Sequence, residues 1–288
     1  MPTVASSLGT DLIGISWALL AYQIPNIGLS IVFGRVSDLW GREKVFGLGF
    51  LVFSLSSLLC GLSMNVMQLI LSRFVQGVGG AMLQSSSRAL AAESVPEELS
   101  GRAQGYMTTA HHAGFVLGPS IGGLMIDYLN WRWSFFLLVP IGLCGTLLTL
   151  ASLRHQHAPP SRHPNVFIDY LGATLLVATT TTLVLIFDRR THEIIGANMK
   201  VALALLLVAC FAALIVHESK TQSPFVDLSL FKIRRFSFSV VSLLIIAMCY
   251  SLIGFLMPFY LQDILGLTPT AVDCFLWRRR CSPSPLPL

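Results

Sequence analysis

The chain has 288 residues, of which 54% are hydrophobic and only 11% are charged. Soluble domains carry about 25% charged residues, so this composition excludes an ordinary soluble protein and predicts an all-α integral membrane protein. The net charge of +5 could serve nucleic-acid binding, but the basic residues lie in short segments between apolar runs. That pattern is typical of membrane orientation, and we expect no nucleic-acid partner.

Eight apolar runs are long enough to cross a bilayer, which takes about 20 residues in a helix. The runs are continuous rather than alternating, which favours helices over a β-barrel. The predicted spans are roughly 12–33, 45–64, 66–90, 103–126, 134–153, 170–187, 199–217 and 236–261.

Lys and Arg predict the orientation of these spans. If residues 34–44 lie in the cytoplasm, eleven basic residues fall on the cytoplasmic side and four on the opposite side. Because basic residues are retained on the cytoplasmic side, we expect a multi-pass protein of the cell membrane in this orientation, with the lipid bilayer as its partner.

The first segment between spans, GRVSDLWGREK at residues 34–44, concentrates charge. Gly34 and Gly41 predict a tight reversal between two closely packed helices. Asp38 lies where the first span is expected to end, and can accept hydrogen bonds from helix N-termini or pair with a cytoplasmic arginine, while Arg42 and Lys44 are expected to anchor the segment in the cytoplasm. Alternatively, the basic residues of this segment only serve to keep it on the cytoplasmic side of the membrane.

The third span carries the polar stretch LSRFVQGVGGAMLQSSSRA, residues 71–89. An arginine at this depth costs about 2.5–3.5 kcal/mol, so Arg73 should face protein or water. The alternative is an arginine that reaches the outer interface along its own stem. Spacings of three and four place the following residues on one helix face: Arg73, Gln76, Gly77, Gly80, Gln84 and Arg88.

The fourth span carries GFVLGPSIGG, residues 114–123. Its small residues form a stripe that permits close helix approach, and Pro119 is expected to kink the helix. The glycines of this motif are Gly114, Gly118, Gly122 and Gly123. His111 and His112 precede it and are candidates for titration near neutral pH, although such a pair more often only bonds to its neighbours.

These three motifs, in this order, resemble the major facilitator superfamily. The first resembles the latch between the second and third helices, which implies that Asp38 and Arg42, with Gly34 and Gly41, hold the two halves together on the cytoplasmic side. The pattern R-x-x-Q-G resembles the fourth-helix motif, whose arginine faces the cavity and is implicated in proton transfer. That resemblance places Arg73, Gln76, Gly77 and Gln84 at a proton or substrate cavity. The pattern G-x-x-x-G-P-x-x-G-G resembles the fifth-helix motif of antiporters.

Further stretches resemble the fourteen-spanner drug:proton antiporter branch, namely 130–142, 224–237 and 259–270. The resemblance covers about residues 2–270 and implies a partial major-facilitator fold, without the family's first helix and most of its C-terminal half. The implied divisions are an N-terminal bundle (1–153), a linker with an intercalated helix pair (154–217), the start of a C-terminal bundle (218–270) and an out-of-frame tail (271–288).

The expected function is proton-coupled efflux of multiple drugs or small molecules by alternating access. The resemblance implies lipophilic substrates and protons as partners, with the proton gradient as energy source and no cofactor. All fourteen acidic residues lie at span ends, in connecting segments or in the tail. A membrane fragment without transport activity is therefore the alternative. No catalytic triad or metal-ligand spacing occurs, so we expect neither an enzyme nor a metal site.

Overall fold

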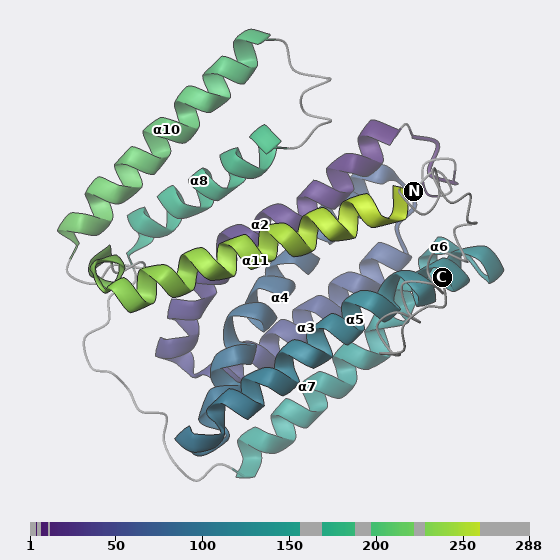
Figure 1. The fold of residues 1–288 in the computed structure, drawn as a ribbon. Coiled ribbons are helices and arrows are strands. Elements are labelled where there is room, and N and C mark those ends of the chain that lie inside the picture. The colour runs from purple at the N-terminus through teal and green to yellow at the C-terminus, as the bar shows by residue number, and fades with distance from the viewer. Residues whose placement is uncertain are drawn as a thin grey trace, which may run out of the picture. The chain divides into compact units, whose positions relative to one another are not determined.

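The computed structural model describes residues 4, 7–10, 12–155, 169–187, 197–221 and 228–259 (Figure 1). Most of the predicted linker and the whole predicted tail at 271–288 lie outside the described residues. The chain divides into two compact units, one made of residues 1–113 and 121–226 and the other of residues 114–120 and 227–288. This division does not test the predicted bundle boundaries, which stay a prediction.

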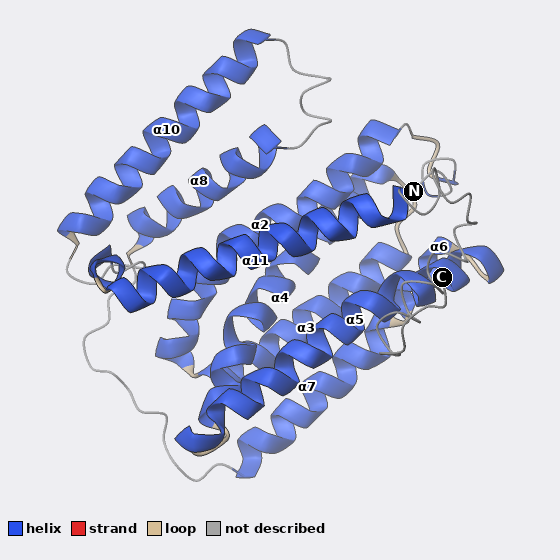
Figure 2. Cartoon of the chain, viewed as in Figure 1, coloured by secondary structure: helices blue, strands red, loops and turns tan. Residues whose placement is uncertain are grey.

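The described residues form helices joined by turns and loops and contain no strand, which confirms the all-α prediction (Figure 2). Eight long helices match the eight predicted spans: α2 (Leu12–Trp40), α3 (Arg42–Gly61), α4 (Val66–Glu93), α5 (Ser100–Tyr128), α7 (Leu138–His155), α8 (Tyr170–Phe187), α10 (Ala197–Lys220) and α11 (Arg234–Phe259). Short helical segments lie between them: η1 (Glu97–Leu99), α6 (Trp131–Phe136) and η2 (Leu228–Lys232).

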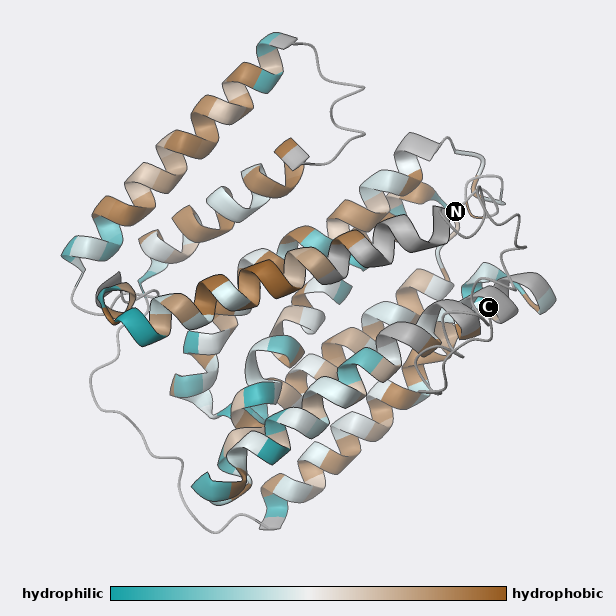
Figure 3. Cartoon of the chain, in the orientation of Figure 1, coloured by the Kyte–Doolittle hydropathy of each residue, from teal (hydrophilic) through white to brown (hydrophobic). Residues whose placement is uncertain are grey.

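Five stretches within the described residues are long and apolar enough to cross a membrane. They are Gly14–Trp40, Arg42–Gly61, Val66–Glu93, Trp131–Arg154 and Asn198–Lys220; Tyr170–Ile186 is apolar but shorter. Apolar residues dominate the middle of α10, and polar residues lie at its ends (Figure 3). The chain is a multi-pass membrane protein, as its composition predicts.

Helix α4 packs between α2 and α3, and its glycines make both contacts possible. A Cβ added at Gly77 would overlap the Tyr22 carbonyl oxygen and the Pro25 ring on α2. On another side of α4, a Cβ at Gly79 would lie only 2.7 Å from the backbone nitrogen of Phe53 on α3. Small residues allow such backbone approach where lipid provides no hydrophobic drive for helices to associate.

The remaining helices of this unit add to the α2–α3–α4 group. Helix α7 lies against α3, where Ser54 Oγ donates to the Val139 carbonyl at 2.9 Å. Helix α8 packs against α2, and a Cβ at Gly28 would lie 3.0 Å from Thr180 Oγ1. Helix α10 in turn packs against α8.

The turn between α2 and α3 is shorter than the sequence predicts. Helix α2 continues to Trp40 rather than ending near residue 33, so Gly34 lies inside the helix and has no reversal to make. Gly41 alone forms the reversal, with φ of 98°. The prediction that both glycines shape the turn is wrong, because hydropathy marks where the lipid ends, whereas backbone hydrogen bonds extend the helix into polar surroundings.

A contact between a carboxylate and a histidine joins one end of α8 to one end of α10. Asp169 Oδ1 accepts from the Gly172 N–H at 2.9 Å, and Asp169 Oδ2 lies 2.6 Å from His217 Nε2. Burial acts to raise the pKa of Asp169, but the hydrogen bonds from Gly172 and His217 and the attraction of His217 together outweigh it. The pKa of Asp169 therefore lies below its ordinary value.

Candidate functional site: two arginine clusters

Arg73 lies seven residues into α4, about 10 Å along the helix axis from its first residue. Its Cζ lies 5.2 Å from the centre of the Tyr22 ring on α2 and 5.1 Å from that of Phe135 on α6. Aromatic rings at this range attract a cation. The guanidinium of Arg73 therefore lies against protein side chains of α2 and α6.

Gln76 connects Arg73 to α3. Arg73 Nη1 donates to Gln76 Oε1 at 2.8 Å, and Gln76 Nε2 donates to Ser57 Oγ at 2.7 Å. The Gln76 side chain is 1% exposed, and the buried Cys60 thiol lies 4.0 Å from the same Oε1 atom. We name Arg73, Gln76, Ser57, Cys60, Tyr22 and Phe135 the Arg73 cluster.

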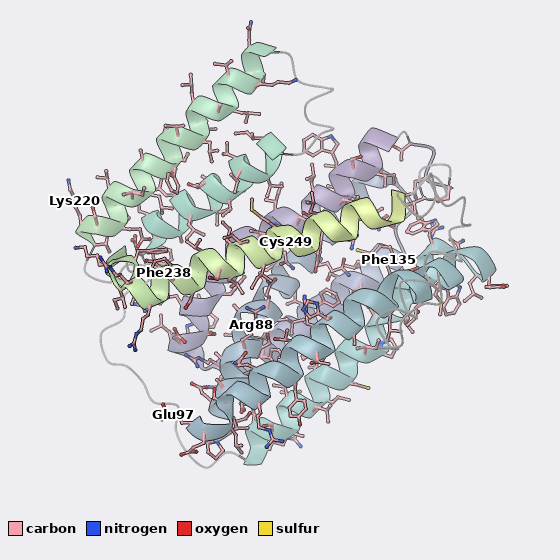
Figure 4. The ribbon with its side chains drawn as sticks, viewed as in Figure 1. Arg88, Glu97, Phe135, Lys220, Phe238 and Cys249 are labelled. Atoms are coloured by element: carbon pink, nitrogen blue, oxygen red, sulfur yellow. The ribbon has the colours of Figure 1, made fainter. Side chains whose placement is uncertain are left out.

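The other predicted residues of α4 lie in different surroundings. Gly77 lies against the backbone of α2, in the close helix contact described above. Gln84 and Arg88 are exposed nearer the other end of the helix, where the Arg88 carbonyl accepts from Gln104 Nε2 on α5 at 2.9 Å. In Figure 4, Phe135 lies toward the end of this unit away from Glu97. The structure thus joins Arg73 and Gln76 directly but leaves Gln84 apart from them, and the cavity role of all four stays a prediction.

Arg42 forms a second cluster at the opposite end of the helices. Its Nε and Nη2 atoms donate to Asp38 Oδ1 at 3.0 and 2.9 Å, and its Nη1 atom donates to Glu93 Oε1 at 2.5 Å. The side chains of Arg42, Asp38 and Glu93 are 30%, 39% and 59% exposed. We name these three residues the Arg42 cluster. It ties the turn between α2 and α3 to the end of α4, and the pairing of Asp38 with an arginine is as predicted.

The predicted fifth-helix motif lies on α5, which runs as a continuous helix through residue 119. A Cβ added at Gly114, Gly118 or Gly122 would meet no described atom within 4 Å. His111 and His112 are exposed, with ring centres 5.9 Å apart. Pro119 and Gly123 belong to the helix, but the surroundings of both residues lie outside the described part. The antiporter role of this motif and the titration of the two histidines stay predictions.

The two clusters differ in chemistry. Within the described residues Arg73 forms no ion pair, and its contacts are an amide oxygen and two rings. The guanidinium stays protonated at physiological pH, so Arg73 can supply a fixed positive charge but cannot itself release a proton. Among the described residues, no three His, Cys, Asp or Glu side chains gather as a metal site would require.

Sequence reasoning missed four members of the Arg73 cluster. Tyr22 and Phe135 are aromatic residues that nothing in the sequence distinguishes from other apolar-run residues, and Ser57 and Cys60 have the size of ordinary helix-packing residues. One signal was available, since an arginine placed within a span needs nearby partners that compensate its charge. The identity of those partners depends on helix packing, which no local pattern reveals.

The family model described as Major Facilitator Superfamily matches residues 1–276. The chain belongs to the Major Facilitator Superfamily. This membership agrees with the predicted partial major-facilitator fold and with the expectation that the chain is not an enzyme.

Several curated members of the Major Facilitator Superfamily are similar to the chain. The riboflavin transporter RibZ of Clostridioides difficile is 29% identical over 271 residues, covering 93% of this chain and 57% of the relative. The multidrug export protein EmrB of Haemophilus influenzae is 29% identical, over 94% of this chain and 52% of the relative. A putative multidrug resistance protein, MdtD of Escherichia fergusonii, is 28% identical, over 93% and 56%. The chain spans about half the length of these relatives.

Proposed function

We propose that the chain forms part of a proton-coupled exporter of lipophilic small molecules that works by alternating access. The single observation that carries this proposal is the Arg73 cluster, because a cation at this depth is costly and is held by protein rather than by lipid. The names of the relatives, which include a multidrug export protein and a putative multidrug resistance protein, support small-molecule efflux as the class of activity.

In this proposal Arg73 supplies fixed positive charge to a cavity. A fixed cation lowers the cost of a negative charge nearby, so it favours the ionised form of an acid or the binding of an anionic group. Loss of the coupled proton from such an acid would then be linked to a change in the cavity. The energy source is the proton gradient, and no cofactor takes part.

The Arg42 cluster would act as the latch of this cycle. Ion pairs as exposed as these contribute about 0.2–1 kcal/mol each, because water and salt screen them. Contacts of that size can form and break repeatedly without trapping one state, which suits an element that must open in every cycle.

The decisive experiment measures efflux from a drug-sensitive host that expresses the chain, using several lipophilic cations and neutral dyes. We expect lower accumulation than in the empty host, and the difference should disappear when an uncoupler collapses the proton gradient. The Arg73→Lys variant keeps the charge but loses the planar fork, and should lose efflux. The matched control is Arg88→Lys on the exposed part of the same helix, which should keep it. Unchanged accumulation with the wild-type chain in the membrane would count against the proposal.

A membrane fragment without transport activity is the second candidate. It is favoured by the position of the acids, since the described ones lie at helix ends and connections, as Asp38, Glu93 and Asp169 illustrate. In proteoliposomes this candidate predicts correct insertion but no substrate flux under a proton gradient. Flux that follows the gradient would exclude it.

A further inference from the structure

We infer that Ser57 on α3 is a positioning residue for Arg73, and that it acts by orienting the amide of Gln76. This inference deepens the proposed function, and its relevance to transport rests on that function. Ser57 belongs to none of the three motifs that the sequence singles out. It lies 19 residues from Gln76 along the chain and on a different helix.

The direction of the hydrogen bonds carries the inference. A serine hydroxyl has a single hydrogen, and Ser57 Oγ donates it to the Phe53 carbonyl at 2.6 Å. Toward Gln76, Ser57 can therefore act only as an acceptor. The group that faces it must be the donor end of the amide, which is the Nε2 atom at 2.7 Å.

This arrangement fixes the other end of the amide. With Nε2 directed at Ser57, Gln76 Oε1 faces Arg73 and accepts from Nη1 at 2.8 Å. In the flipped orientation an amide N–H₂ group would face the guanidinium, so that two donors would oppose each other. Ser57 thus selects the orientation in which Gln76 can hold Arg73 between the rings of Tyr22 and Phe135.

Burial makes the selection strict. Ser57 is 0% exposed and Gln76 is 1% exposed, so water cannot replace a lost partner at either group. A buried polar group without a partner is unfavourable, and the amide would have to rotate or the helices would have to separate. Either change would release Arg73 from its position.

The neighbouring serine provides a matched control. Ser56 is also buried, at 1% exposure, and among the described residues its hydroxyl donates to the carbonyls of Val52 and Phe53, both within its own helix. Ser56→Ala and Ser57→Ala each remove one buried hydroxyl from α3. Only the second removes the acceptor that Gln76 uses.

Cys60 reports on the order of the cluster without any transport assay. Its thiol is 0% exposed and lies 4.0 Å from Gln76 Oε1, so alkylation requires the cluster to open. The experiment uses the full chain in membranes, with the other five cysteines replaced by alanine, and measures the rate of modification by N-ethylmaleimide. We expect Ser57→Ala to raise this rate about tenfold and Ser56→Ala to change it less than about twofold.

Two further variants separate positioning from packing. In a Gln76→Ala background, Ser57→Ala should add nothing, because Ser57 acts only through Gln76. Ser57→Thr keeps the acceptor, and its Cys60 should be modified at the wild-type rate. Ser57→Val has the shape of Ser57→Thr without the hydroxyl, and its Cys60 should be modified faster. This pair differs only in the hydroxyl, and it makes the same comparison if Ser57→Ala fails to insert.

The outcomes distinguish this inference from the proposed function. Equal labelling of the Ser56→Ala and Ser57→Ala variants would overturn the positioning role, as would an effect of Ser57→Ala that persists without Gln76. Absence of flux in the wild-type chain would count against the proposed transport function but would not bear on the positioning role of Ser57. Where flux is present, we expect Ser57→Ala to reduce it and Ser57→Thr to restore it.

Discussion

Two arginines, Arg42 at the start of α3 and Arg73 on α4, are stabilised by different kinds of partner. Arg42 meets two carboxylates near the polar end of the helices, and all three side chains are about a third exposed or more. Arg73 meets an amide oxygen and two aromatic rings within a helical span. Where water and headgroups are near, a carboxylate costs little. Within a span a second charge would require its own compensation, so neutral acceptors and ring faces take its place.

Replacing each arginine by lysine gives the largest expected contrast between the two clusters. Arg73→Lys loses ring stacking and the planar fork, and we expect at least about a tenfold fall in efflux rate at unchanged membrane level. Arg42→Lys keeps a mobile charge beside two carboxylates and should stay within about twofold of the wild type. Initial efflux rates in everted vesicles provide the measurement. A larger loss in Arg42→Lys would reverse the comparison.

We expect a glycine in the close helix contact beside the Arg73 cluster to matter more for stability than a glycine on α5. Gly77→Ala places a Cβ against the backbone of Tyr22, which cannot move as a flexible side chain can, and should reduce the free energy of unfolding by about 1–3 kcal/mol. Gly105→Ala on α5 meets no described atom within 4 Å, and a helical glycine replaced by alanine should be neutral or slightly stabilising. Thermal unfolding of both variants in the same detergent tests this, and equal melting temperatures would refute it.

Salt dependence sharpens the distinction between exposed ion pairs and buried neutral contacts. Arg42→Gln removes two pairs worth about 0.2–1 kcal/mol each, and this loss should shrink as salt rises toward 1 M, where the Debye length is about 3 Å. Arg73→Gln should destabilise the protein by an amount that salt hardly changes. Melting temperatures at low and high salt measure both effects. A salt-sensitive effect at Arg73 would show that its surroundings are wet.

The smallest expected effect concerns the contact between Asp169 and His217, whose side chains are less exposed than those of the Arg42 cluster. Because the pKa of Asp169 is lowered from its ordinary value of 3.8, its contribution to stability is present above that value. The contribution is lost as pH falls through the lowered pKa. The Asp169→Asn variant keeps His217 but has no carboxylate to protonate at this position. It should therefore show a weaker acid-induced fall in melting temperature below about pH 4. Identical pH curves for variant and wild type would contradict this.

Much of the fold follows from the sequence, because the requirement behind it is local. Every backbone group in a bilayer must bond within its own helix, so an apolar run near 20 residues specifies a helix whatever its neighbours. The eight long helices confirm this. Their ends were less predictable, as the extension of α2 past Gly34 shows, because apolarity reports lipid contact rather than helix length.

The candidate site divides in the same way. The sequence alone determined that Arg73 and Gln76 share a helix face, because helical periodicity sets their spacing, and that Asp38 and Arg42 belong to one short charged segment between two spans. Only the tertiary structure decided that Gln76 meets Ser57, that Arg73 lies between Tyr22 and Phe135, and that Glu93 joins Arg42 across 51 residues. Those pairings arise from glycine-mediated contacts between helices, and a contact between distant residues depends on how whole helices pack rather than on any local pattern.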